Sequence, residues 1–142
     1  MARALGGAVS RNAVKEIRWG RVNVTDDSTA SQWFWARREF NGFHWHGETF
    51  SIPPGATRIA ASAHCDNQAF VIGRNLARQC HVEMTADLVR AWCAEWGSEV
   101  DKVRSESIQT PQQMLAGFDA HVAELHRVAD GLYDRWVEGL AR

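Results

Sequence analysis

The most sheet-like part of the sequence is residues 57–85, TRIAASAHCDNQAFVIGRNLARQCHVEMT. It contains three short strand-like runs, at 57–63, 68–72 and 76–82, with turn-forming residues between them. Short runs joined by tight turns are typical of an antiparallel meander. After Thr85, which can cap a helix, the apolar residues take up helical spacing. We therefore predict antiparallel strands followed by a helix in the middle of the chain.

Further strand-like pieces precede this meander. Short runs lie at 7–10, 16–19 and 21–25, and another at 43–46 leads into a glycine. Aspartate and serine side chains that can cap a helix precede a helical stretch at 31–38. We expect several short strands and one short helix in this first part of the chain.

The sequence pattern in the last part of the chain predicts a helix. A capping box with proline at the first helical position, TPQQ, stands at 110–113. Apolar residues then recur at steps of three and four as far as Leu140, which is typical of one face of an amphipathic helix. We predict a single long helix over 111–140, within a helical extension at 98–142. Residues 1–97 form the main domain.

Composition excludes several classes of protein. With 142 residues, 45% of them hydrophobic and 23% charged, the chain is long and apolar enough for an ordinary folded domain. A formal net charge of -1 argues against nucleic acid or an anionic membrane as a partner. Three scattered cysteines do not make a disulfide framework. We expect a cytoplasmic protein with no nucleic-acid or membrane partner.

The histidines and cysteines raise the question of a metal site. His44 and His46 share one face of the expected strand, so both imidazoles could reach one ion. Glu48 follows too closely for a cupin-type ligand set, and nothing in the spacing demands that His64 or Cys65 join them. We therefore predict neither a metal nor a cofactor.

A stronger chemical signal lies at the end of the meander. On an extended segment His81 and Glu83 point to the same side, so the carboxylate can fix the tautomer of the imidazole. That is the base and its orienting partner in a nucleophilic triad, although a surface His/Glu pair would look the same. Cys80 would face away from the imidazole, and Cys65 and Cys93 lack a nucleophile-elbow sequence.

Six separated motifs together resemble one family. They occur in the order LGG at 5–7, KEIRWG at 15–20, HWHGETF at 44–50, PPGA at 53–56, NQAF at 67–70 and QCHVEMT at 79–85. Over residues 1–97 the chain looks like the C-terminal half of a class I (triad) glutamine amidotransferase domain, similar to the glutaminase domain of GMP synthase. The resemblance implies an α/β, flavodoxin-like fold whose mixed sheet carries an antiparallel hairpin.

The resemblance also implies an activity. Family members hydrolyse glutamine to glutamate and ammonia through a γ-glutamyl thioester on a cysteine, which sits in a G-x-C-x-G elbow and is activated by histidine and glutamate. Carried over by motif, His81 matches the triad histidine and Glu83 the triad glutamate. Trp45, His46 and Gly47 match the loop that lines the glutamine pocket, partly through backbone groups.

The sequence departs from the family pattern in three places. Val82 replaces a proline between the two triad residues, and Arg18 replaces a common glycine. The G-x-C-x-G elbow is absent from the 142 residues. Residues 1–7 look like the last turn of a helix without its beginning, so we expect Met1 to be an internal methionine that follows the elbow.

These observations leave three functions open, in the following order. The first is a glutamine amidotransferase represented by its C-terminal portion and inactive without its cysteine. The alternative is a non-catalytic binding or regulatory remnant of the family. A metal-binding β-domain ranks third. We expect glutamine or another γ-glutamyl compound as the substrate, and a synthetase or a second copy of the chain as a partner of the 111–140 helix.

Overall fold

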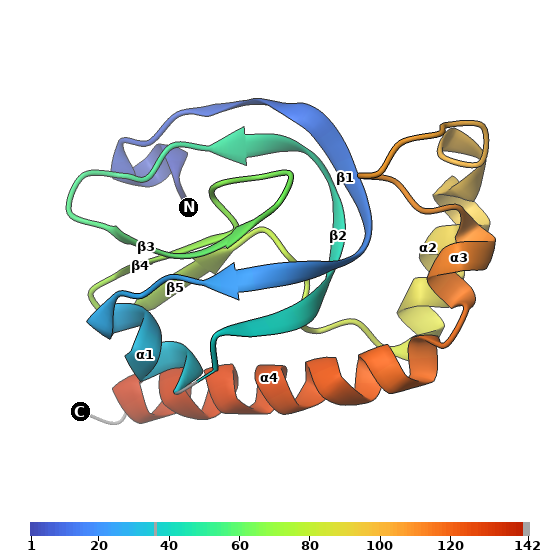
Figure 1. Cartoon of the computed structure of the whole chain (residues 1–142). Helices are drawn as coiled ribbons and strands as arrows, with labels where there is room; N and C mark the ends of the chain where they lie inside the picture. Colours follow the sequence, from blue (N-terminus) through green and yellow to red (C-terminus); the bar gives the residue numbers. More distant parts are fainter. Residues whose placement is uncertain (36, 141–142) are drawn as a thin grey trace.

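A single antiparallel sheet organises the fold. The computed structural model describes residues 1–35 and 37–140. The strands are β1 (Val9–Val24), β2 (Glu39–Phe50), β3 (Thr57–Ser62), β4 (Ala69–Ile72) and β5 (Asn75–Arg78). Their order in the sheet is β2-β1-β3-β4-β5, and each neighbouring pair is antiparallel. β1 and β2 are long and strongly bent, and they curl around the shorter strands (Figure 1).

The prediction of several short strands before the meander was wrong. The pieces expected at 7–10, 16–19 and 21–25 are parts of the one strand β1, which pairs with β2 along most of its length. A register shift between Arg11 and Glu16 interrupts the ladder without ending the strand. Pairing with a long partner therefore overrides the irregular pattern at the bulge.

The predicted meander is confirmed as β3, β4 and β5. Its last strand ends at Arg78, four residues earlier than the apolar run suggested. The chain then turns to β2, where His81 and Phe43 form an isolated antiparallel bridge with backbone N···O distances of 2.8 and 3.3 Å. This bridge fixes the backbone of the predicted triad histidine against the sheet.

The helices partly follow the prediction. They are the 3-10 turns η1 (Arg3–Leu5) and η2 (Gly97–Glu99), and the helices α1 (Ser28–Phe34), α2 (Ala86–Trp96), α3 (Pro111–Leu115) and α4 (Phe118–Leu140). The caps at Thr85 and Thr110 are confirmed, the latter as a complete capping box. The prediction of a single helix over 111–140 was wrong, because Gly117 adopts a φ of 65° and separates α3 from α4.

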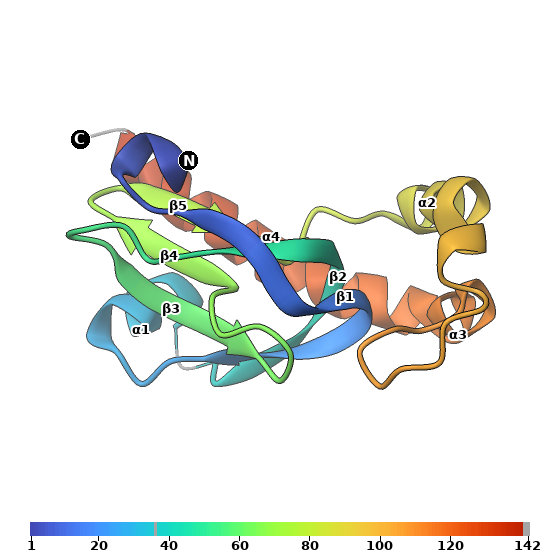
Figure 2. The same cartoon turned by 90° about the horizontal axis from the view of Figure 1, so that it is seen from above.

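Helix α4 runs along the sheet and contacts β2 and α1, while α2 and α3 lie together at one end of the molecule (Figure 1 and Figure 2). The first six apolar residues of the predicted stripe are buried in the common core, namely Met114, Phe118, Val122, Leu125, Ala129 and Leu132. The last two, Trp136 and Leu140, are exposed. No helix in the described part of the chain is long and apolar enough to cross a membrane.

The predicted α/β class is confirmed as a mixed arrangement of helices and one sheet. Within residues 1–35 and 37–140 the sheet is entirely antiparallel, and the one parallel contact is an isolated bridge between Ile17 and Ile108. The parallel strands of the expected flavodoxin-like sheet are thus not among these residues. The opening segment is a short helical turn that ends at Gly6 with a φ of 85°, as its composition predicted.

Candidate active site

The structure brings the predicted pair together. The Nδ1 atom of His81 lies 2.6 Å from Oε1 of Glu83, so the imidazole donates a short hydrogen bond to the carboxylate. This bond places the proton on Nδ1 and leaves Nε2 as the basic nitrogen. Among the described residues Nε2 has no hydrogen-bonding partner. The pair therefore has the tautomer and the free nitrogen that a general base requires.

Arg78 is a third member of this group that the sequence did not reveal. Its guanidinium lies 2.6 Å from Oε2 of Glu83 and also donates to the backbone carbonyl of Cys80. A second guanidinium nitrogen donates to the hydroxyl of Tyr133 on α4, at 3.2 Å. Burial raises the pKa of Glu83, but hydrogen bonds from His81 and Arg78 outweigh it and hold that pKa well below its ordinary value. Glu83 is therefore an anion at neutral pH.

An aromatic cluster supports the other side of the imidazole. Trp92 on α2 meets the ring of His81 edge-on, with centroids 5.0 Å apart and an interplanar angle of 87°. The indole of Trp92 also contacts Phe43 and Trp45, at 6.1 and 5.8 Å between centroids. Because Phe43 is the backbone partner of His81, both the backbone and the ring of the histidine are held by the same group of residues.

The His81–Glu83 pair opens onto a surface hollow. Its lining comes from Met1 and from the segment around the pair, namely Leu76, Ala77, Arg78, Gln79, Cys80, His81 and Glu83. The side chains of His81 and Glu83 are 26% and 40% exposed. A reactant in this hollow could therefore reach the imidazole from solvent.

None of the three cysteines is placed to act with His81. All three are buried and unpaired, and within the described residues none is hydrogen bonded to the imidazole. Burial raises the pKa of Cys80 to about 12, so its thiol is not ionised at neutral pH. The thiol of Cys65 is hydrogen bonded to Thr49 and Gln79 instead, at 3.3 Å each. Burial also raises the pKa of Cys93.

The three predicted pocket residues, Trp45, His46 and Gly47, lie in three different environments. Trp45 lies in the aromatic cluster and is linked to His81 through Trp92. The next residue points to the other face of β2, where His46 contacts Gln68 and Gln79. Gly47 lies against the side chain of Lys15. Trp45 and His46 therefore reach the His81 region only through intermediates, Trp92 and Gln79 respectively.

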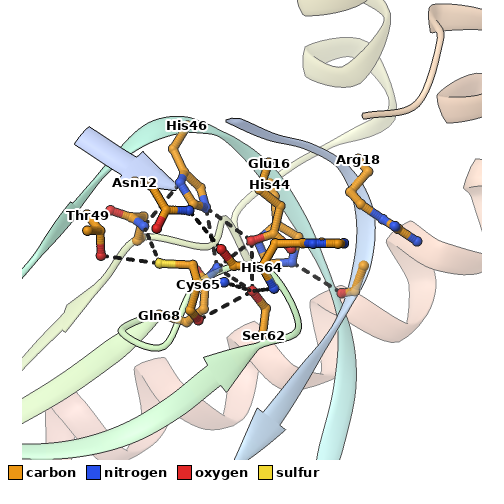
Figure 3. Close-up of polar contacts among 12 residues, drawn as sticks. Asn12, Glu16, Arg18, His44, His46, Thr49, Ser62, His64, Cys65 and Gln68 are labelled. Carbon is orange, nitrogen blue, oxygen red and sulfur yellow. Dashed lines mark hydrogen bonds and ion pairs between the residues drawn. The ribbon is translucent and has the colours of Figure 1, made fainter. Parts of the chain in front are cut away.

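His46 belongs to a buried polar cluster inside the curled sheet (Figure 3). The cluster comprises Glu16 of β1, His44 and His46 of β2, Ser62 of β3, and Gln68 just before β4. Glu16 accepts hydrogen bonds from Ser62 at 2.7 Å and from Gln68 at 2.8 Å. Sequence analysis named the two histidines but not Glu16, which lies far from them along the chain and meets them only because β1 pairs with β2.

Comparison with known structures identifies the fold. A glutamine amidotransferase from Methylobacillus flagellatus matches 97% of this chain with a TM-score of 0.92 and 37% sequence identity. By its structure, the chain belongs to the glutamine amidotransferase family. A glutamine amidotransferase from Thermotoga maritima matches 96% of the chain, with a TM-score of 0.82 and 30% identity. No family profile and no curated protein sequence matches this chain.

The chain spans 58% and 57% of the lengths of these two structures. It corresponds to the C-terminal part of the glutamine amidotransferase fold, as the resemblance predicted. A Thermoplasma acidophilum protein described as a GMP synthase component, at 18% identity and a TM-score of 0.51, shares the fold alone.

Proposed function

We propose that this chain carries the base and orienting residues of a glutaminase site, which hydrolyses glutamine to glutamate and ammonia. The observation that carries the proposal is the His81–Glu83 contact of 2.6 Å, with the glutamate anchored by Arg78 and the imidazole Nε2 left free. His81 would act as the base, Glu83 would orient it, and Arg78 would hold Glu83 in place. Family membership supports glutamine as the substrate.

The geometry suits the following sequence of steps. Nε2 of His81 takes the proton of a cysteine thiol, and Glu83 stabilises the imidazolium that forms. The thiolate adds to the carboxamide carbon of glutamine, and the imidazolium then protonates the leaving nitrogen, which departs as ammonia. A water molecule deprotonated by the same nitrogen cleaves the thioester to glutamate and restores the thiol.

In this proposal the cysteine comes from polypeptide outside residues 1–142, because all three thiols of this chain are buried and that of Cys65 is hydrogen bonded to Thr49 and Gln79. Met1 lines the same hollow as the pair. Polypeptide joined to residue 1 would therefore enter beside the imidazole. We propose that the parallel strands of the flavodoxin-like sheet belong to the same polypeptide as this cysteine.

Ammonia release from glutamine tests this proposal, in the polypeptide that includes the cysteine and residues 1–142. His81→Asn should lower kcat by about 10²–10⁴-fold, which is the usual contribution of a general base. His64→Asn is a matched control, since no side-chain hydrogen bond of His64 is found among the described residues. Full activity of His81→Asn, or equal activity of residues 1–142 alone, would contradict the proposal.

The alternative function, a non-catalytic binding or regulatory role, is favoured by the lack of a thiol beside His81 in the described part of the chain. It predicts that residues 1–142 are folded and monodisperse by circular dichroism and light scattering. It also predicts that a longer polypeptide binds glutamine without releasing ammonia. The ammonia assay therefore separates the two functions.

We further propose that partner contact is confined to the end of α4. The expected 111–140 surface is mostly buried, but Tyr133, Trp136, Val137 and Leu140 are exposed. These residues support contact with a synthetase or a second copy of the chain. Three unpaired cysteines support a reducing, cytoplasmic location.

A further inference from the structure

We propose that Glu16, His44 and His46 form a binding site for a divalent metal ion of the zinc type, separate from the His81–Glu83 pair. The Oε2 atom of Glu16 lies 3.6 Å from Nδ1 of His44 and 3.5 Å from Nε2 of His46. These three atoms all lie within 4.8 Å of one another. In tetrahedral zinc sites the bonds of about 2.0–2.2 Å separate neighbouring ligand atoms by about 3.4 Å.

The hydrogen bonding of His44 shows what is missing from this cluster. Its Nε2 contacts the carbonyl oxygen of Gly20 at 3.3 Å, and a carbonyl oxygen can only accept, so Nε2 carries the proton. In the neutral ring Nδ1 then carries a lone pair, and this atom has no hydrogen-bonding partner among the described residues. This lone pair faces the carboxylate of Glu16 within a fully buried pair of side chains.

Without a cation, the contact between the Glu16 carboxylate and the lone pair of His44 is electrostatically unfavourable. The His44 side chain is fully buried, and burial favours the neutral form of an imidazole. Glu16 accepts hydrogen bonds from Ser62 and Gln68, at 2.7 and 2.8 Å, and such donors favour the ionised carboxylate. Two electron-rich atoms therefore face each other in a dry interior, where a cation between them would remove the repulsion.

The second histidine completes the pattern. The Nδ1 atom of His46 lies 3.2 Å from the carbonyl oxygen of Glu48, to which it can donate, and 3.1 Å from the side-chain amide nitrogen of Gln79. With the proton on Nδ1, Nε2 carries a lone pair that faces Glu16 and the amide group of Gln68. Metal-bound histidines characteristically donate their other ring nitrogen to a carbonyl or carboxylate, and both rings have such a carbonyl here.

Gln68 offers a fourth ligand. Its Oε1 atom is the other buried side-chain atom without a hydrogen-bonding partner among the described residues. Its amide nitrogen already contacts both Glu16 and His46, at 2.8 and 3.3 Å. Because the oxygen and nitrogen of an amide exchange places by a half-turn, the oxygen can occupy this position. Two imidazoles and a carboxylate form a donor set that zinc accepts, with the amide oxygen of Gln68 or a water molecule in the fourth position.

The site would connect two strands of the sheet with the residue that precedes a third. Glu16 lies on β1, both histidines lie on β2, and Gln68 directly precedes β4. The side chain of His46 is 10% exposed, so an ion would enter beside it. A bound ion would therefore hold the curled sheet closed behind the face of β2 that carries Phe43 and Trp45.

Titration of the tag-free, chelator-treated chain with Co²⁺ and then Zn²⁺ tests the proposal. We expect one equivalent of Co²⁺ with the intense d–d absorption of a four-coordinate site, displacement by Zn²⁺, and a higher Tm in the presence of Zn²⁺. Glu16→Gln and His46→Asn should each weaken binding by more than about 100-fold, because even outer-shell partners are worth 10–100-fold. His64→Asn and His81→Asn should bind as the unchanged chain does.

Three outcomes would overturn the proposal. One is a chain that is folded by circular dichroism and binds no Co²⁺. Another is unchanged binding in both Glu16→Gln and His46→Asn. The third is loss of binding in His81→Asn alone, which would place the ion at the candidate active site. His46 lies at the rim of the cluster, so its variant remains informative even if Glu16→Gln fails to fold.

Discussion

Replacing Trp19 with phenylalanine should destabilise the whole molecule, because this side chain joins the sheet to the C-terminal helices. Trp19 is 3% exposed, and its indole N–H donates to the carbonyl oxygen of Met114 at 2.9 Å. Met114 stands near the end of α3, where a helix has carbonyl groups without partners of their own. The ring also packs edge-on against Phe43, at 4.9 Å between centroids.

Two costs set the magnitude. Phenylalanine has no N–H group, so the buried carbonyl of Met114 loses its partner, at a cost of about 1–3 kcal/mol. The smaller ring also leaves a space in a close-packed region, which adds roughly 1 kcal/mol. The free energy of unfolding should therefore fall by about 2–4 kcal/mol.

Urea unfolding followed by far-ultraviolet circular dichroism measures this change. With a slope of about 2 kcal/mol per molar urea, the midpoint should fall by about 1–2 M. Trp136→Phe is the matched control, because Trp136 is 44% exposed and its replacement should change stability by less than about 0.5 kcal/mol.

Equal midpoints for the two variants would refute this reasoning. So would a biphasic transition in which Trp19→Phe affects one phase only, since residues 98–142 would then unfold independently of the sheet. A single, lowered transition is expected if the core is continuous.

Three further predictions concern smaller groups of residues. Arg78→Met removes a guanidinium that lies 2.6 Å from Glu83, so the pKa of this carboxyl should rise, as carbon-detected NMR titration would show. In the native chain Cys80 should resist alkylation at pH 8 and react once guanidinium unfolds it, because burial raises its pKa to about 12. Gly97→Ala should cost about 1–3 kcal/mol in urea unfolding, because the new Cβ would lie 2.6 Å from Cγ of Pro111.

Each of these predictions has a control or a contradicting result. The sign for Glu83 follows from its lowered pKa: its contribution to stability is present above the unfolded pKa and is lost as the pH falls through the folded pKa. Arg78→Met raises the folded pKa, so it should make this contribution smaller and complete its loss at a higher pH. Rapid labelling of native Cys80 would contradict its burial. Gly139→Ala, whose Cβ would meet nothing closer than 3.9 Å, should not destabilise the helix, whereas equal effects at both glycines would contradict the contact with Pro111.

Local sequence determined the features that depend on neighbours in the chain. The meander at β3–β5, the caps at Thr85 and Thr110 and the glycine stop at Gly6 follow from turn and capping chemistry that acts over a few residues. The His81–Glu83 contact belongs to this group because the two residues are only two positions apart, although the segment that carries them lies beyond the end of β5. The motifs also identified the family.

Tertiary structure decided the features that depend on partners far away in the chain. β1 is one strand because β2 pairs along it, whereas its own pattern suggested three pieces. Arg78 and Tyr133 meet only because α4 lies beside the end of the meander. Likewise, Glu48 follows the histidines in sequence but the carboxylate that reaches them is Glu16, because antiparallel pairing places it opposite His46. Spacing along the chain sets which residues share a face, and only the register between strands sets which faces meet.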